Sequence, residues 1–284
     1  MESRHPFHSA SGFQGFWELR CILIRTISII QIQIVISQNA LLCGIKSSEP
    51  LEMEYVIEQG DYYPVSLGMN CFPRMYTQRI YKKIYPRLPF DYVGTPMWGI
   101  NEAIKADFKG FASIKCLQPY KIYKNEEYIR LTNVNYMIAF LHDHLTINNE
   151  KMNPSLISKE QSIKVEQDYL RRIQRWKALL DSGSKLLFFR LTRSEEERIQ
   201  YVTDKPSEKE ALEEFSRTMK ARNLRFKILY FTYDHENTYD TESQIIYVNI
   251  PKIEKITVNL IGQLLSDDEI LRHVRESLNQ PPQS

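Results

Sequence analysis

Three unbroken apolar runs in the C-terminal third of the chain predict buried strands, at residues 185–191, 226–233 and 245–250. A charged amphipathic segment over 207–222 lies between the first two runs and predicts a helix long enough for a crossover connection. Strands that are buried on both faces read as continuous apolar runs, and such strands alternate with helices in a parallel sheet. The pattern therefore predicts an α/β fold with a mostly parallel sheet that is flanked by helices.

A shorter apolar run over 63–68 ends at a glycine and predicts a strand that leads into a turn. Two helices are predicted after it, at 72–84 and at 97–108. Proline stands near the start of each, Pro73 in the first turn of one helix and Pro96 at the first position of the other, where its missing N–H costs nothing.

The longest helical pattern covers 158–180, and a last helix is predicted at 266–278. Ser158 and Gln161 have the spacing of a capping box, and Gly183 lies just past the predicted helix end. The stretch over 114–138 is predicted to be irregular, with tyrosine-rich pieces that resemble strands.

The first 52 residues differ from the rest, so we divide the chain into an extension, 1–52, and one α/β domain, 53–284. Eight isoleucines lie between Ile22 and Ile36, and no charged residue occurs from Thr26 to Ile45. This uncharged stretch has about the length of one bilayer span. Three interpretations stand: a disordered or non-native leader upstream of a start at Met53, a membrane anchor or export signal over 21–45, and a strand, which the alternating glutamines favour.

Composition narrows the class of protein. The 284 residues carry a formal net charge of +2, without the strongly basic balance of a nucleic-acid binder, so no nucleic-acid partner is expected. The four cysteines form no CxxC pair and are too few for a disulfide scaffold. We expect a protein of a reducing compartment, the cytoplasm, with membrane association only through 21–45.

Cys71 is the first candidate for chemistry, because it follows the predicted strand and glycine turn at the start of a predicted helix. The helix dipole and the free N–H groups of a first turn favour a thiolate there, and the same N–H groups would suit an oxyanion hole. The alternative is an inert buried cysteine, which is the commonest fate of a free thiol.

His142 and His144 are the second candidate. In an extended segment both point to the same face, so one can reach Cys71 while the other binds substrate. Asp91 or Asp143 would orient the imidazole of His142, which acts as the base.

Further polar residues are assigned to substrate binding, among them Asn70 beside Cys71, and Arg171 and Arg175, which form a solvated helix face or bind an acidic group. A metal site built from the two histidines and Cys71 is a competing interpretation. No other cluster of ligands supports it, so we predict neither a metal nor a cofactor. The pair Asp234 and His235, after a strand end, is a weaker candidate.

Together these residues resemble a bacterial family described as putative papain-like cysteine peptidases, the domain of unknown function numbered 1796. The resemblance covers residues 62 to 235, and its motifs are Ser66-Leu67-Gly68-Met69-Asn70-Cys71, Pro89-Phe90-Asp91-Tyr92, His142-Asp143, Tyr169-Leu-Arg-Arg-Ile173-Gln-Arg175 and Leu186-Leu-Phe-Phe-Arg190. The family usually has tryptophan where this chain has Tyr92. The resemblance implies Cys71 as nucleophile and His142 as base. It also implies an alternative fold, papain-like α+β, with the histidine on an antiparallel sheet.

The sequence thus predicts a cysteine-nucleophile hydrolase that cleaves an amide or ester bond of a peptide or small molecule through a thioester. The alternative is a non-hydrolytic α/β protein or transferase that binds a sugar or nucleotide. A distance beyond about 8 Å between the Cys71 sulfur and either imidazole would favour this alternative. No feature of the sequence defines an oligomeric state.

Overall fold

The computed structural model describes residues 62–81, 85–120, 130–142, 158–191, 205–233, 235–250 and 267–281. The predicted extension over 1–52 lies outside the described residues, and so does the apolar segment over 21–45. In the part of the chain that is described, no helix combines the length and the apolar character that a membrane crossing requires.

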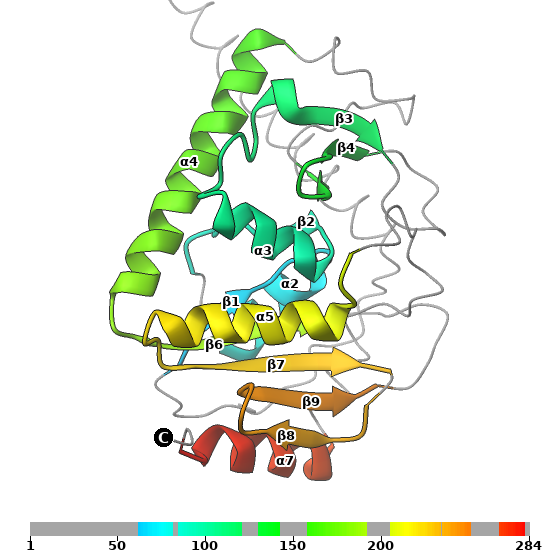
Figure 1. Cartoon of the computed structure of the whole chain (residues 1–284), viewed down its shortest axis with the longest axis vertical. Helices are drawn as coiled ribbons and strands as arrows, with labels where there is room; N and C mark the ends of the chain where they lie inside the picture. The colour runs from blue at the N-terminus through cyan, green and yellow to red at the C-terminus, as the bar shows by residue number, and fades with distance from the viewer. Residues whose placement is uncertain are drawn as a thin grey trace, which may run out of the picture. The chain divides into compact units, whose positions relative to one another are not determined.

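The larger of two sheets has five strands in the order β1-β6-β7-β9-β8 (Figure 1). The first four are parallel to one another, and β8 pairs with β9 in the antiparallel direction at the edge. This confirms the predicted α/β fold with a mostly parallel sheet. The short edge strand was not predicted, because three half-exposed residues carry little pattern. The strands are β1 Tyr62–Ser66, β6 Lys185–Leu191, β7 Phe226–Thr232, β8 Thr238–Asp240 and β9 Ile245–Asn249.

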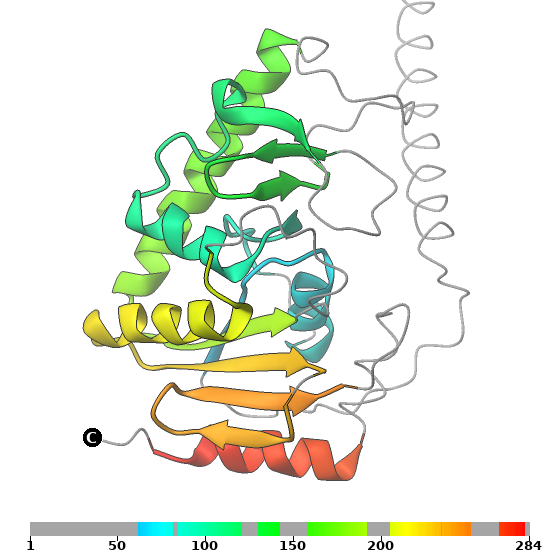
Figure 2. The same ribbon diagram turned by 45° about the vertical axis from the view of Figure 1, so that its right-hand side comes forward.

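Both faces of this sheet are buried, which explains the unbroken apolar runs. In β6, Leu186 and Phe188 join the core that includes α5 (Glu208–Ala221), whereas Leu187 and Phe189 join the core that includes α7 (Asp268–Asn279). Successive side chains of a strand point to opposite faces, so apolar residues are favoured at consecutive positions rather than at every second one. Figure 2 shows the strands running between these two helices.

The predicted helices are present, with small changes at their ends. α2 spans Phe72–Tyr81, α3 Met97–Lys105 and α4 Lys159–Asp181. As predicted, the Ser158 hydroxyl accepts a hydrogen bond from the Gln161 N–H at the start of α4 and Gly183 lies past its end, where it has φ +71°. α3 ends three residues early because Asp107 and Phe108 take left-handed conformations that a helix cannot include.

A second, antiparallel sheet has the strand order β2-β5-β4-β3. The sequence predicted only irregular strand-like pieces for 114–138, since strands this short show no clear alternation. The strands are β2 Val93–Gly94, β3 Leu117–Tyr120, β4 Arg130–Asn133 and β5 Ile138–Phe140. The chain therefore combines the predicted parallel sheet with a small antiparallel sheet of the kind that the family resemblance implied.

A cluster of aromatic rings joins α4 to this antiparallel sheet. The Phe90 ring meets the Trp176 ring edge-on at 5.2 Å between centroids, and the Phe140 ring meets Tyr169 in the same way at 5.0 Å. All four side chains are buried. Edge-to-face pairs of this kind restrict ring positions as well as burying area. The cluster therefore anchors the loop at Phe90 and the end of β5.

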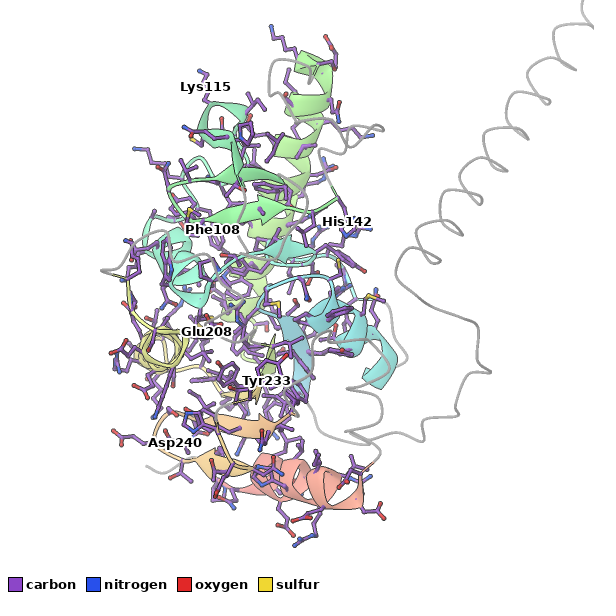
Figure 3. All side chains as sticks on the ribbon, turned by 90° about the vertical axis from the view of Figure 1, so that its right-hand side faces the viewer. Phe108, Lys115, His142, Glu208, Tyr233 and Asp240 are labelled. Atoms are coloured by element: carbon purple, nitrogen blue, oxygen red, sulfur yellow. The ribbon has the colours of Figure 1, made fainter. Side chains whose placement is uncertain are left out.

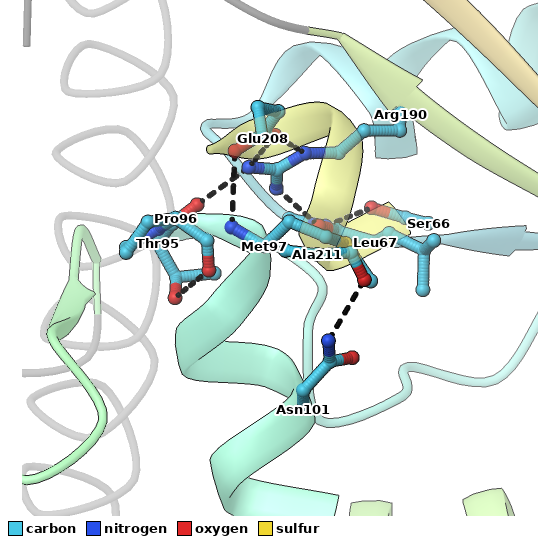
Figure 4. A network of polar contacts seen from close by, with 10 residues as sticks. Ser66, Leu67, Thr95, Pro96, Met97, Asn101, Arg190, Glu208 and Ala211 are labelled. Carbon is cyan, nitrogen blue, oxygen red and sulfur yellow. Dashed lines mark hydrogen bonds and ion pairs between the residues drawn. The ribbon is translucent and has the colours of Figure 1, made fainter. Parts of the chain in front are cut away.

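A buried ion pair lies at the carboxyl end of the parallel sheet (Figure 4). Arg190, near the end of β6, and Glu208, at the start of α5, are 1% and 4% exposed, and the Arg190 Nε–H donates to Glu208 Oε1 at 2.6 Å. The same guanidinium donates to the carbonyl oxygens of Leu67 and Thr95 at 2.6 and 2.9 Å. One side chain thus ties together the segments that follow β1 and β2.

Glu208 completes the network from the other side. Its Oε2 accepts a hydrogen bond from the Met97 N–H, at 3.2 Å, at the start of α3. Pro96 is the N-cap of α3, whereas the sequence predicted it as the first residue. Because the proline side chain cannot accept a hydrogen bond, the Glu208 carboxylate from α5 satisfies the Met97 N–H in its place. The negative charge of Glu208 also interacts favourably with the positive N-terminal end of the α3 dipole.

Replacing Glu208 with glutamine tests how much this network contributes to the stability of the fold. Glu208→Gln keeps the shape of the side chain but leaves the Arg190 charge buried without its partner, so we expect the free energy of unfolding to fall by about 3–5 kcal/mol. Urea denaturation followed by circular dichroism measures the change. Glu213→Gln, on the same helix, is the matched control and should lose no more than about 0.5 kcal/mol. If both variants lose the same free energy of unfolding, the ion pair makes no special contribution to stability.

Candidate active site

A tight turn carries the chain from β1 to the candidate nucleophile. Gly68 and Met69 both have positive φ, +68° and +81°, in the bend between the end of β1 and Cys71. A left-handed conformation is ordinary for glycine, but for a residue with a side chain such as methionine it costs about 1–3 kcal/mol. Such strain persists only where the surroundings enforce it.

Gly68 is needed for a second reason, which is close packing. A Cβ atom at this position would lie 3.0 Å from Thr95 Cγ2 and 3.3 Å from Val93 Cγ2. Without that atom, the turn lies directly against β2 and the residue that follows it. The turn that bears Cys71 is thereby pressed onto the strand that pairs with β5.

Cys71 is the N-cap residue of α2, and its carbonyl oxygen accepts the Met75 N–H at 3.1 Å. The Phe72 N–H donates to Asn70 Oδ1 at 2.8 Å, and Pro73 has no N–H. Of the first-turn positions that the sequence suggested for an oxyanion hole, Phe72 has an engaged N–H and Pro73 has none. Since Oδ1 of Asn70 accepts this bond, its Nδ2 group is left as a donor at the rim of the turn.

His142 follows β5, which pairs with β2 so that Phe140 lies opposite Val93. This pairing brings the imidazole to the turn at the end of β1, and Cys71 Sγ lies 3.0 Å from His142 Nε2. The distance is far inside the limit beyond which a hydrolase would be disfavoured. Cys71 is half-buried and His142 is exposed, so the pair is open to a substrate; Figure 3 shows His142 at the edge of the molecule.

Tyr92 and Arg87 lie next to this pair. The Tyr92 ring meets the His142 ring edge-on at 5.7 Å between centroids, and the Arg87 guanidinium lies 5.2 Å from the centre of the Tyr92 ring. Tyr92 has φ +61°, a conformation that its neighbours must enforce. The sequence pointed to Tyr92 only as part of a motif, and it did not single out Arg87.

Asp91, one of the two carboxylates assigned to orient His142, is directed elsewhere. It is fully buried, its Oδ2 accepts the Leu88 N–H at 2.8 Å, and it lies 3.5 Å from Nε of the buried Arg74. Burial raises the pKa of Asp91 to about 6, because the Arg74 charge and the Leu88 N–H recover only part of the lost hydration. Asp91 therefore balances charge inside the domain.

The other predicted site residues are distributed more widely. Arg171 is exposed on α4 and forms an ion pair with Asp168, whereas the Arg175 Nε–H donates to the Arg87 carbonyl oxygen at 3.0 Å. The His235 ring lies tilted against the Tyr247 ring, at 4.6 Å between centroids. Asp143, His144 and Asp234 lie outside the described residues. Within the described ranges, no three histidine, cysteine or acidic side chains gather as a metal site would require.

Residues 63–236, more than half of the chain, match the model of the family described as "Putative papain-like cysteine peptidase", the domain of unknown function numbered 1796. The chain belongs to this family. No curated protein and no solved structure matches the chain. The region shared with this peptidase family contains both members of the Cys71–His142 pair, and it also contains the Arg190–Glu208 ion pair that holds the turn before Cys71.

A titration experiment tests the position of Asp91. The folded chain keeps the Asp91 proton up to a pKa of about 6, whereas the unfolded carboxyl loses it near its ordinary pKa of 3.8. Folding therefore takes up a proton between these values, and raising the pH through this window lowers the free energy of unfolding. Because asparagine does not titrate, we expect Asp91→Asn to gain about 2–3 kcal/mol relative to the wild type between pH 4 and pH 7.

Urea denaturation of both proteins at pH 4 and pH 7 measures this gain. The relevant quantity is the change in the difference between the two proteins, so other titrating groups cancel. A gain by the wild type instead would mean that Arg74 lowers the pKa of the Asp91 carboxyl below its ordinary value.

Proposed function

We propose that the chain is a cysteine hydrolase that cleaves amide or ester bonds, with Cys71 as nucleophile and His142 as general base and acid. The observation that carries the proposal is the 3.0 Å distance between Cys71 Sγ and His142 Nε2, on segments 71 positions apart in the sequence. A thiol and an imidazole in hydrogen-bond contact are the minimum equipment of a thiol hydrolase. Membership of a family described as papain-like peptidases supports the same conclusion.

In the first half of the reaction, His142 takes the Cys71 proton and the thiolate attacks the carbonyl carbon of the substrate. A sulfur–carbon bond forms and the carbonyl oxygen becomes an oxyanion. The imidazolium then returns its proton to the leaving amine or alcohol as the scissile bond breaks, which leaves a thioester on Cys71. The half-buried sulfur and the exposed imidazole give a carbonyl group access to both atoms.

In the second half, a water molecule attacks the thioester while His142 accepts a proton from it. The tetrahedral intermediate collapses, the acid product leaves, and Cys71 regains its proton. Tyr92 limits rotation of the imidazole in both halves, because its ring contacts the imidazole edge-on.

The Asn70 side chain supplies an oxyanion donor in this scheme. Its Oδ1 accepts the Phe72 N–H, which restricts rotation of the carboxamide and leaves Nδ2 as the donor. A preorganised donor of this kind stabilises the transition state more than the substrate, because it meets charge that develops only as the thiolate attacks.

Alkylation with iodoacetamide tests the nucleophile without knowledge of the substrate. We expect Cys71 to react at pH 6.5 at least about tenfold faster than Cys116, since an ordinary thiol reacts only as the pH approaches about 8.5. Mass spectrometry of peptides at timed intervals measures both rates in one sample. His142→Ala should remove the advantage, and equal rates for the two cysteines in the wild type would contradict the proposal.

A panel of fluorogenic peptides and esters tests the reaction itself. For any substrate that the wild type cleaves, Cys71→Ser should lower kcat by at least about a thousandfold while the melting temperature stays within a few degrees. Cys116→Ser, the matched control, should retain full activity. Turnover that survives Cys71→Ser would refute the role of Cys71.

Asn70→Ser separates the two functions of Asn70. A serine hydroxyl can still accept the Phe72 N–H but cannot reach an oxyanion, so we expect kcat to fall by about tenfold to a thousandfold with little change in KM. Thermal unfolding shows whether the start of α2 is intact. A normal kcat in a stable variant would assign the oxyanion donor to another group.

A further inference from the structure

The structure assigns an anion-binding position beside the Cys71–His142 pair, and we propose that Arg87, supported by Arg175, binds a carboxylate group of the substrate. The hydrolase would then prefer acidic peptides or acyl compounds that carry a carboxylate close to the scissile bond. This inference rests on the proposed function, since it names the substrate class of the same site.

Contacts between rings place Arg87 near the reacting atoms. The Arg87 guanidinium lies 5.2 Å from the Tyr92 ring centre, which is 5.7 Å from the centre of the His142 imidazole. The distance from the guanidinium to the centre of the imidazole is therefore at most the sum of these two distances. An extended peptide advances by about 3.3–3.6 Å per residue, so an acidic side chain one to three residues from the scissile bond can reach it.

Among the described residues around the site, positive charges outnumber negative ones, which favours binding of an anion. The Arg87 and Arg175 side chains are exposed, and neither guanidinium is in direct ion-pair contact with a carboxylate of the described residues. The carboxylate of Asp91 is buried against Arg74, and the charges of Arg172 and Arg87 also act on it. Because one carboxylate faces several guanidinium groups, a positive potential remains at the rim where a substrate enters.

Contacts with α4 and α2 also hold Arg87 and the ring beneath its guanidinium in position. The Arg175 Nε–H donates to the Arg87 carbonyl oxygen at 3.0 Å, which ties the backbone of residue 87 to α4. The Tyr92 ring on which the guanidinium rests has its hydroxyl 3.4 Å from Gln78 Oε1 on α2. A guanidinium that is stacked on a fixed ring loses less freedom when it binds a ligand than one on a free side chain.

Arginine suits a carboxylate because its planar group donates two parallel hydrogen bonds to the two oxygens. The carboxylate can come from an aspartate or glutamate side chain, or from a free terminal carboxyl group. The chemistry at Arg87 is the same in both cases, so the experiment has one arm for each source.

The test compares the rates at which matched electrophiles modify Cys71. In the first arm, acetyl-Glu-Ala and acetyl-Gln-Ala chloromethyl ketones differ only in one side-chain charge. In the second, an epoxysuccinyl-leucyl amide carries either a free carboxyl group or its ethyl ester. We expect the acid to react about threefold to fivefold faster in at least one arm, and the preference to shrink in 1 M salt.

Variants then assign the preference. Arg87→Gln should abolish it, Arg87→Lys should retain part of it, and Arg175→Gln should reduce it. Arg217→Gln, at an exposed position of α5, is the matched control and should leave the preference unchanged. Melting temperatures confirm that each exposed substitution leaves the fold intact.

The outcomes separate this inference from the proposed function. If Cys71 reacts with the neutral probes but the wild type shows no preference for acids, or if the preference survives Arg87→Gln, the anion-binding position is refuted and the hydrolase proposal stands. If Cys71 reacts with none of the probes, both are refuted.

Discussion

The buried ion pair between Arg190 and Glu208 brings together three segments that are distant in the sequence. The Arg190 guanidinium donates to the Leu67 and Thr95 carbonyl oxygens, while Glu208 accepts the Met97 N–H. Burial of two charges costs several kcal/mol per ion, so the pair is tolerable only when its remaining hydrogen bonds are made. The carbonyl groups after β1 and β2 must therefore lie where the guanidinium needs them, and the turn that carries Cys71 begins directly after Leu67.

The Cys71–His142 contact depends on this arrangement, because its two members belong to different sheets. Cys71 follows a strand of the parallel sheet, and His142 follows β5 of the antiparallel sheet. β2 lies between them, since it pairs with β5 and also packs against Gly68, where no side chain intervenes. A shift of β2 would move the imidazole relative to the sulfur, although neither residue lies in that strand. The geometry of the pair is thus a tertiary property of the junction between two sheets.

This dependence explains which features could be predicted from the sequence. The runs that became β6, β7 and β9 are long and mostly apolar, and α4 has a capping serine just before its first residue, so local pattern sufficed for these elements. The antiparallel strands have two to four residues and show no period, and Asp91 has the same appearance in the sequence whether it faces a histidine or an arginine. Arg190 was an available clue, because a charged residue inside an apolar strand requires a buried partner. Its partner, Glu208, had no local mark of its role.

The loop that contains Asp91 joins the stability of the domain to the chemistry of its site. Phe90 enters the aromatic cluster on α4, Asp91 offsets the buried Arg74, and Tyr92 turns outward against His142 within three consecutive residues. These roles are physically coupled, because a left-handed Tyr92 is held in place only while the residues on either side are anchored. The loop therefore cannot relax to improve one contact without loss of another. The rigidity that fixes the imidazole of His142 is therefore the same rigidity that keeps the Arg87 guanidinium stacked on the Tyr92 ring.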